Sequence, residues 1–104
     1  MGQVELLARR VAVPVRHLAG LQLVRAADAP LLLDEIEREG LRVIGAEGFH
    51  VDGRHVTPVM DAILDLSSLQ DPEQSVREAR RFVDVVAAPA LFLEFGVRRE
   101  VQET

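Results

Sequence analysis

The fold is decided by the stretch TPVMDAILDLS, residues 57–67. Its apolar residues fit both the 3.6-residue period of a helix and the two-residue period of a strand. The helical set is Val59, Ala62, Ile63 and Leu66, whereas the alternating set is Met60, Ala62, Leu64 and Leu66. We interpret the stretch as a strand, because the segment after it carries its own complete set of helix signals.

Those helix signals begin at residue 71. Asp71 can cap a helix, Pro72 suits its first position, and Gln74 can complete a capping box. An apolar stripe with helical spacing follows, made of Val76, Ala79, Val83 and Val86. Pro89 then predicts the end of the helix, since proline cannot continue the hydrogen-bond ladder.

Two elements are predicted between residues 20 and 40. Alternation over residues 21–25 predicts the first core strand. Asp28 or Ala29 can cap a helix that enters through Pro30 and stops at Gly40. The apolar residues of this helix are Leu32, Leu33 and Ile36, which recur at helical spacing.

The remaining residues before the deciding stretch, and those at the end of the chain, predict strands. Residues 41–44 form one strand, and residues 49–56 form a hairpin around the strong turn signal Asp52-Gly53. Residues 91–95 form a strongly apolar last strand. The core order is therefore βαββαβ.

This order predicts an α+β, ferredoxin-like fold, with a four-stranded antiparallel sheet and two helices on one of its faces. The other face of the sheet would be uncovered. We expect one domain over residues 1–104, comprising an N-terminal extension (1–19), a core (20–97) and a charged tail (98–104). Residues 1–19 fit either a short helix, through Val4, Leu7, Ala8 and Val11, or an edge strand, through Val11, Val13 and Val15.

Composition excludes several kinds of chemistry. The chain has no cysteine and no lysine, so thiol catalysis, cysteine-ligated metals, Schiff-base chemistry and P-loop chemistry are ruled out. No apolar run reaches the roughly 20 residues of a membrane helix, and we expect a cytoplasmic protein that binds no membrane. No catalytic motif is recognisable, so we expect a non-enzyme without a cofactor; an enzyme that uses Asp61, Asp65 and His50 or His55 is the third hypothesis, after the two binding functions given below.

The formal net charge is −5, and its distribution is uneven. Residues 27–75 contain eleven acids against three arginines, which argues against a nucleic-acid partner. On the predicted helix, Glu35 and Glu39 lie four residues apart and acids crowd its C-terminal end, a slightly unfavourable arrangement that can mark a binding surface. Asp34, Glu35 and Glu39 are therefore candidate partner-binding residues, although a solvated helix face explains them equally simply.

Asp61 and Asp65 are the second candidate pair. In a strand they share a face with Ile63, and a ferredoxin-like sheet would put this strand at its centre, so both acids would occupy the middle of the uncovered face. Paired carboxylates in such a position can do acid–base chemistry or hold Mg²⁺. Salt bridges to Arg25 or Arg42, or simple solvation, are the ordinary alternative.

A third candidate is a histidine pair. If Asp52-Gly53 is a two-residue loop, His50 lies opposite His55 with Cβ atoms about 5 Å apart, close enough to share a transition metal. A stable metal site needs further ligands, and an exposed hairpin pair is the simpler interpretation.

The run LVRAADAPLLLDEI, residues 23–36, followed by Gly40-Leu41-Arg42-Val43, resembles the start of an ACT domain. ACT domains are βαββαβ modules that bind small ligands, often amino acids, at dimer interfaces. The resemblance covers about a fifth of the chain, and Leu31 stands where that family has a glycine.

Two functions follow from the sequence. The first is a non-enzymatic protein-binding module whose acidic surface docks a basic partner, as immunity proteins and antitoxins do. The second, which the ACT resemblance implies, is a small-ligand-sensing regulatory domain that acts as a homodimer.

Overall fold

The stretch that decides the fold forms a strand, as predicted. In the computed structural model, which describes residues 2–86 and 91–99, strand β4 spans His55–Asp65 and contains most of it. The other strands are β1 (Arg16–Leu18), β2 (Leu21–Arg25), β3 (Arg42–Asp52) and β5 (Leu91–Arg98). The α-helices are α1 (Gln3–Arg10), α2 (Ala29–Arg38) and α3 (Pro72–Val86), and a 3₁₀ turn, Ala26–Asp28, precedes α2. Pro89 and most of the predicted tail lie outside the described residues.

The strands form one antiparallel sheet with the order β1-β2-β5-β3-β4. The α+β class is confirmed, but the sheet has five strands, and the four-stranded ferredoxin-like arrangement is not confirmed. The predicted central position of β4 is wrong, because β4 pairs with β3 alone and β5 lies at the centre. Strands β2 and β3 both pair with β5, so the α2 connection skips one strand position, and the α3 connection skips β3 in the same way.

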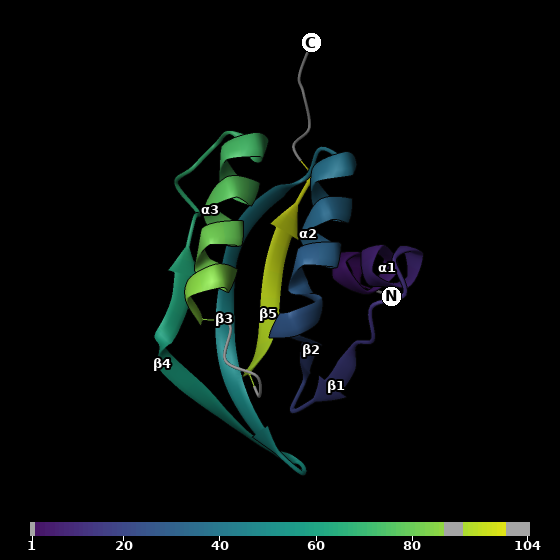
Figure 1. Ribbon diagram of the computed structural model, residues 1–104, viewed down its shortest axis with the longest axis vertical. Coiled ribbons are helices and arrows are strands. Elements are labelled where there is room, and N and C mark those ends of the chain that lie inside the picture. The colour runs from purple at the N-terminus through teal and green to yellow at the C-terminus, as the bar shows by residue number, and fades with distance from the viewer. Residues whose placement is uncertain (1, 87–90, 100–104) are drawn as a thin grey trace.

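Helices α2 and α3 lie side by side over one face of the sheet, and α1 packs beside α2 (Figure 1). The main core lies between these helices and the sheet. From β5 it takes Leu91, Leu93 and Phe95, and from the helices it takes Leu32, Leu33, Ile36, Val76, Ala79 and Val83. The predicted stripes of both helices are therefore confirmed as buried faces.

The C-terminal end of α2 forms as the sequence predicts, whereas the predicted cap Asp28 makes no side-chain capping hydrogen bond at its start. Pro30 lies in its first turn, and Gly40 follows it with a φ of +67°, a left-handed conformation that glycine adopts without strain. The Gly40 N–H donates to the Glu37 carbonyl and the Leu41 N–H donates to the Ile36 carbonyl. This pair of hydrogen bonds is the Schellman arrangement that closes a helix and returns the chain to the sheet.

The helical alternative for the N-terminal segment is confirmed, whereas the strand predicted through Val11, Val13 and Val15 does not form and a strand occurs just after it. Val4, Leu7 and Ala8 are buried on helix α1, and a short edge strand, β1, begins two residues after Pro14. His17 of this strand places its Nε2 atom 3.2 Å from Glu5 Oε1 of α1. The N-terminal segment thus extends both the helical layer and the sheet.

Strand β3 runs without a break through Gly45 and Gly48, where the sequence suggests an interruption. Close packing explains both glycines. A Cβ atom at Gly45 would lie 2.8 Å from the Leu64 carbonyl oxygen, and one at Gly48 would lie 2.6 Å from the Ala62 Cβ. Side chains at these two positions would push β4 away from β3.

Ser75 connects α3 to β3 and was not singled out by the sequence. Its fully buried Oγ accepts a hydrogen bond from the Val43 N–H at 2.9 Å and donates to the Pro72 carbonyl at 2.7 Å. The pairing of β3 with β5 shifts by one residue between Val43 and Gly45. The serine therefore satisfies a backbone donor beside the point where the β3–β5 ladder is irregular.

We expect Gly48→Ala to lower the free energy of unfolding by about 1–3 kcal/mol, because the new methyl group overlaps the packed Ala62. Chemical denaturation measures this effect. Gly2→Ala is the matched control, since its Cβ would meet the movable end of the Gln22 side chain. Equal stability of the two variants would contradict the close β3–β4 contact.

Ser75→Ala should cost about 1–3 kcal/mol, because it leaves the buried Val43 N–H without its acceptor. The exposed Ser68 offers the same substitution without burial, and Ser68→Ala should change stability by no more than about 0.5 kcal/mol. Thermal and denaturant unfolding of both variants tests the difference. A silent Ser75→Ala would show that this hydrogen bond does not stabilise the fold.

Candidate functional site

The acids at the C-terminal end of α2 are paired with arginines of the same chain. Glu35 is buried, with carboxylate oxygens 3.8 Å from Arg10 and 3.4 Å from Arg38. Glu39 lies 2.9 Å from Arg10 and 3.7 Å from Arg99. These interactions link α2 to α1 and to the residue that follows β5.

The outer face of α2 is paired in the same way with α3. Arg80 places its guanidinium 2.8 Å from Asp34 Oδ1 and 3.2 Å from Glu37 Oε1. The positive charge beside this acidic helix is thus supplied within one chain. All three candidate acids of α2 thus have intramolecular partners.

The acids on β3 and β4 have a different environment. Glu47 and Asp61 are exposed, and within the described part of the chain neither forms an ion pair. The expected alternative partners are used elsewhere. Arg25 Nε lies 3.9 Å from Asp28, and Arg42, which is buried, donates to the Leu69 carbonyl at 3.0 Å.

A bulge in β4 separates Asp61 from Asp65. Glu47 pairs with Ile63 and Phe49 pairs with Pro58, so Gly48 alone on β3 spans residues 59–62 on β4. Because Gly48 faces Ala62, the extra residues are 59–61. The prediction that Asp61 and Asp65 stand together in the middle of the uncovered face is therefore wrong, and Met60, expected to face the helices, is 77% exposed.

Exposed apolar side chains gather at this edge of the molecule. Among the described residues, five large apolar side chains are exposed: Leu6, Leu31, Met60, Ile63 and Val85. Met60 and Ile63 lie on β4, and Val85 lies in the last turn of α3. We call the exposed residues Met60, Asp61, Ile63 and Asp65, together with Glu47 beside Ile63, the β4 edge.

A surface hollow of about 240 Å³ lies under the bulge. It is lined by His50, Val59, Asp61, Ala62, Val86 and Leu91. The lining is apolar apart from His50 and Asp61, two residues that the sequence assigned to separate candidate sites. The structure brings them together because the bulge turns Asp61 toward the helical layer.

The predicted opposition of His50 and His55 is wrong, because the pairing is shifted by two residues. His50 pairs with Thr57, and His55 pairs with Asp52. Gly53 has a φ of +60° and Asp52 does not have a positive φ, so Gly53 is the first central residue of the turn, as in a type II′ hairpin. The two histidines are diagonal neighbours, about 7–8 Å apart. No group of three metal-ligating side chains occurs among residues 2–86 and 91–99.

The sheet face opposite the helices is less open than the sequence predicts. Leu23 and Phe49 are buried there, apart from the main core. The Arg16 guanidinium lies over the Phe92 ring at 5.6 Å and donates to the Gly53 carbonyl at 3.4 Å. This side chain thus crosses part of the face and links β1 to the β3–β4 turn.

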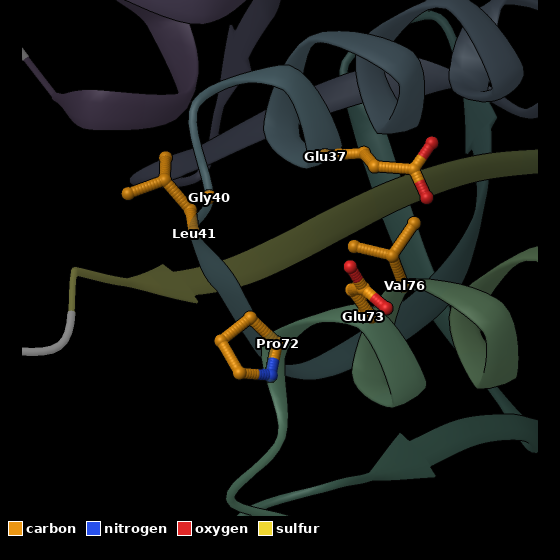
Figure 2. A pocket seen from close by; sticks show the side chains of 6 residues that line it. All are labelled: Glu37, Gly40, Leu41, Pro72, Glu73 and Val76. Carbon is orange, nitrogen blue, oxygen red and sulfur yellow. The ribbon is translucent and has the colours of Figure 1, made fainter.

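A second hollow, of about 120 Å³, lies where α2 and α3 approach each other (Figure 2). Glu37 and Glu73 lie on either side of Val76, and Gly40, Leu41 and Pro72 complete the lining. Glu37 is already paired with Arg80. The hollow is small and carries two acids without a ligand-like arrangement of donors, so it is the weaker candidate.

Asp65 has a local structural role. Its Oδ1 accepts a hydrogen bond from the Ser67 backbone N–H at 2.9 Å, which turns the chain at the end of β4. Hydrogen bonds from the Ser67 side chain and then from its backbone lower the pKa of the Asp65 carboxyl below its ordinary value of 3.8. Of the two acids predicted on this strand, Asp61 is therefore the one without a structural partner among the described residues.

No family model, curated protein or solved structure matches this chain. The ACT resemblance therefore stays a prediction from residues 23–43. In the described part of the chain, every helix is too short or too polar to cross a membrane.

We expect the Asp65 carboxyl to titrate below the ordinary value for aspartate, because the charged form accepts both hydrogen bonds from Ser67. Ser67→Ala should raise this pKa, and Ser68→Ala should leave it unchanged; carboxyl-detected NMR titration measures both. A lowered folded-state pKa stabilises the fold above the unfolded-state pKa, so this contribution should disappear as the pH falls through the folded value. An unchanged titration in Ser67→Ala would contradict the assignment.

Proposed function

We propose that this protein is a non-enzymatic protein-binding module that docks a basic partner along the β4 edge. The observation that carries the proposal is the contrast between two sets of acids. Those of α2 are neutralised by arginines of the same chain, whereas Glu47 and Asp61 have no such partner among the described residues. Exposed Glu73 and Asp84 of α3 also form no ion pair among the described residues, so the β4 edge is distinguished by unpaired acids together with the exposed apolar side chains of β4.

The apolar residues of the same edge support a protein rather than a small ion as the partner. Met60 and Ile63 are 77% and 52% exposed and lie beside Asp61 and Glu47. Protein interfaces combine an apolar centre with charged groups that steer the approach of the partner. A strip of alternating apolar and acidic side chains on an edge strand has this composition.

The arrangement gives little support for catalysis. Asp61 lies beside His50 in the hollow, but the described lining contains no nucleophile and no group positioned to orient either side chain. Acid–base chemistry by this pair would also need substrate contacts that an apolar lining does not supply. Protein binding needs no groups beyond those present at the β4 edge, whereas catalysis would need further ones.

Charge reversal on the β4 edge tests the proposal. The purified chain is used as bait in extracts of its native cells, with cross-linking and mass spectrometry to identify bound proteins. We expect a basic protein to be retained, with an affinity that falls as salt rises. Glu47→Lys combined with Asp61→Lys should weaken its binding about tenfold or more, since both charges would then repel the partner.

The control is Glu73→Lys combined with Asp84→Lys, which makes the same change in net charge on α3. Both residues are exposed, so the fold should tolerate it. This control should retain the partner. Retention by the β4-edge variant together with loss by the α3 variant would place the interface on the helical layer and contradict the proposal.

A further inference from the structure

We propose that the hollow under the β4 bulge receives one large apolar side chain of the partner, from a position next to an arginine or lysine. This inference rests on the proposed protein-binding function and names the partner's contacting residues. The apolar side chain that enters the hollow is an anchor residue of the partner, whereas the proposed function requires only a basic surface on that partner.

The size of the hollow fits a ring. An engineered apolar cavity of about 150 Å³ holds benzene, so a hollow of about 240 Å³ has room for a phenyl or indole group. Its apolar walls are Val59 and Ala62 on β4, Val86 on α3 and Leu91 on β5, and the polar residues His50 on β3 and Asp61 on β4 complete the lining. The apolar walls offer dispersion contacts and no competing hydrogen bonds.

The bulge produces the hollow and its charge together. Residues 59–61 are extra on β4, and they depart from the regular pairing of the strand with β3. Bulges of this kind commonly redirect a side chain at a functional surface. Here Val59 and Asp61 both line the hollow, so the same distortion provides an apolar wall and a carboxylate.

The negative charge of Asp61 indicates which residue should flank the inserted apolar side chain. Asp61 is the only acid of the described lining and has no arginine partner among the described residues. An apolar group alone would leave this carboxylate partly desolvated without a counterion, which is unfavourable. An anchor flanked by arginine or lysine buries its ring and pairs with Asp61 at the rim.

A tryptophan-containing peptide can serve as a fluorescent probe of the hollow, because the chain contains no tryptophan and no tyrosine. The probe is the peptide acetyl-Arg-Trp-Arg-amide, whose fluorescence reports the burial of its indole without background from the protein. We expect a blue shift that saturates at millimolar peptide. Acetyl-Glu-Trp-Glu-amide should bind at least about threefold more weakly, the scale of an exposed ion pair plus repulsion.

Matched variants locate the site. Val59→Phe should fill the hollow and weaken binding about tenfold, whereas Leu31→Phe, the same kind of enlargement on α2 outside both the hollow and the β4 edge, should bind as the unaltered protein does. Asp61→Asn should weaken binding of the Arg-Trp-Arg peptide about threefold. It should not weaken binding of the Glu-Trp-Glu peptide. Circular dichroism and thermal unfolding verify that each variant is folded.

Three results would overturn the inference: no blue shift with the unaltered protein, equal loss in both phenylalanine variants, or equal binding of the two peptides. These outcomes are separable from failure of the proposed function. If Val59→Phe retains the native partner while Glu47→Lys with Asp61→Lys releases it, the β4 edge binds a basic protein without using the hollow.

Discussion

The fold depends on the close contact of β3 with strands on both of its sides. β3 pairs with the central strand β5 on one side and with the edge strand β4 on the other. Gly45 and Gly48 allow this approach, because any side chain at either position would meet β4 within 3 Å. The Ser75 hydroxyl fixes the start of the strand against α3. The position of the β4 edge therefore depends on Gly45, Gly48 and Ser75.

Local signals made most of the elements predictable from the sequence. Helices α2 and α3 follow from Pro30, Gly40, Pro72 and their apolar stripes, and β4 follows from its alternation and from the helix after it. The order of strands was not predictable, because it depends on which distant strand pairs with β5. Neither the one-residue shift near Val43 nor the bulge before Ala62 has a clear sequence signal.

The candidate site was predictable in composition and not in geometry. The sequence identified an acidic central segment, but a count of charges does not show which acids find arginine partners. Arg10, Arg80 and Arg99 come from three separate segments and converge on α2, which adds Arg38 of its own. Asp61 was among the predicted site residues, but the hollow it lines was missed, since it requires a bulge that brings Asp61 and Ala62 to one side.

The irregularity of β4 also bears on how the protein behaves at high concentration. An exposed edge strand is a template for the backbone of another chain, and long flat edges lead to aggregation and fibrils. Pro58 lacks an amide hydrogen, and the three residues after it interrupt the ladder, so β4 presents two short, misaligned pieces of edge. The strand can display Met60 and Ile63 to solvent while discouraging identical molecules from stacking onto it.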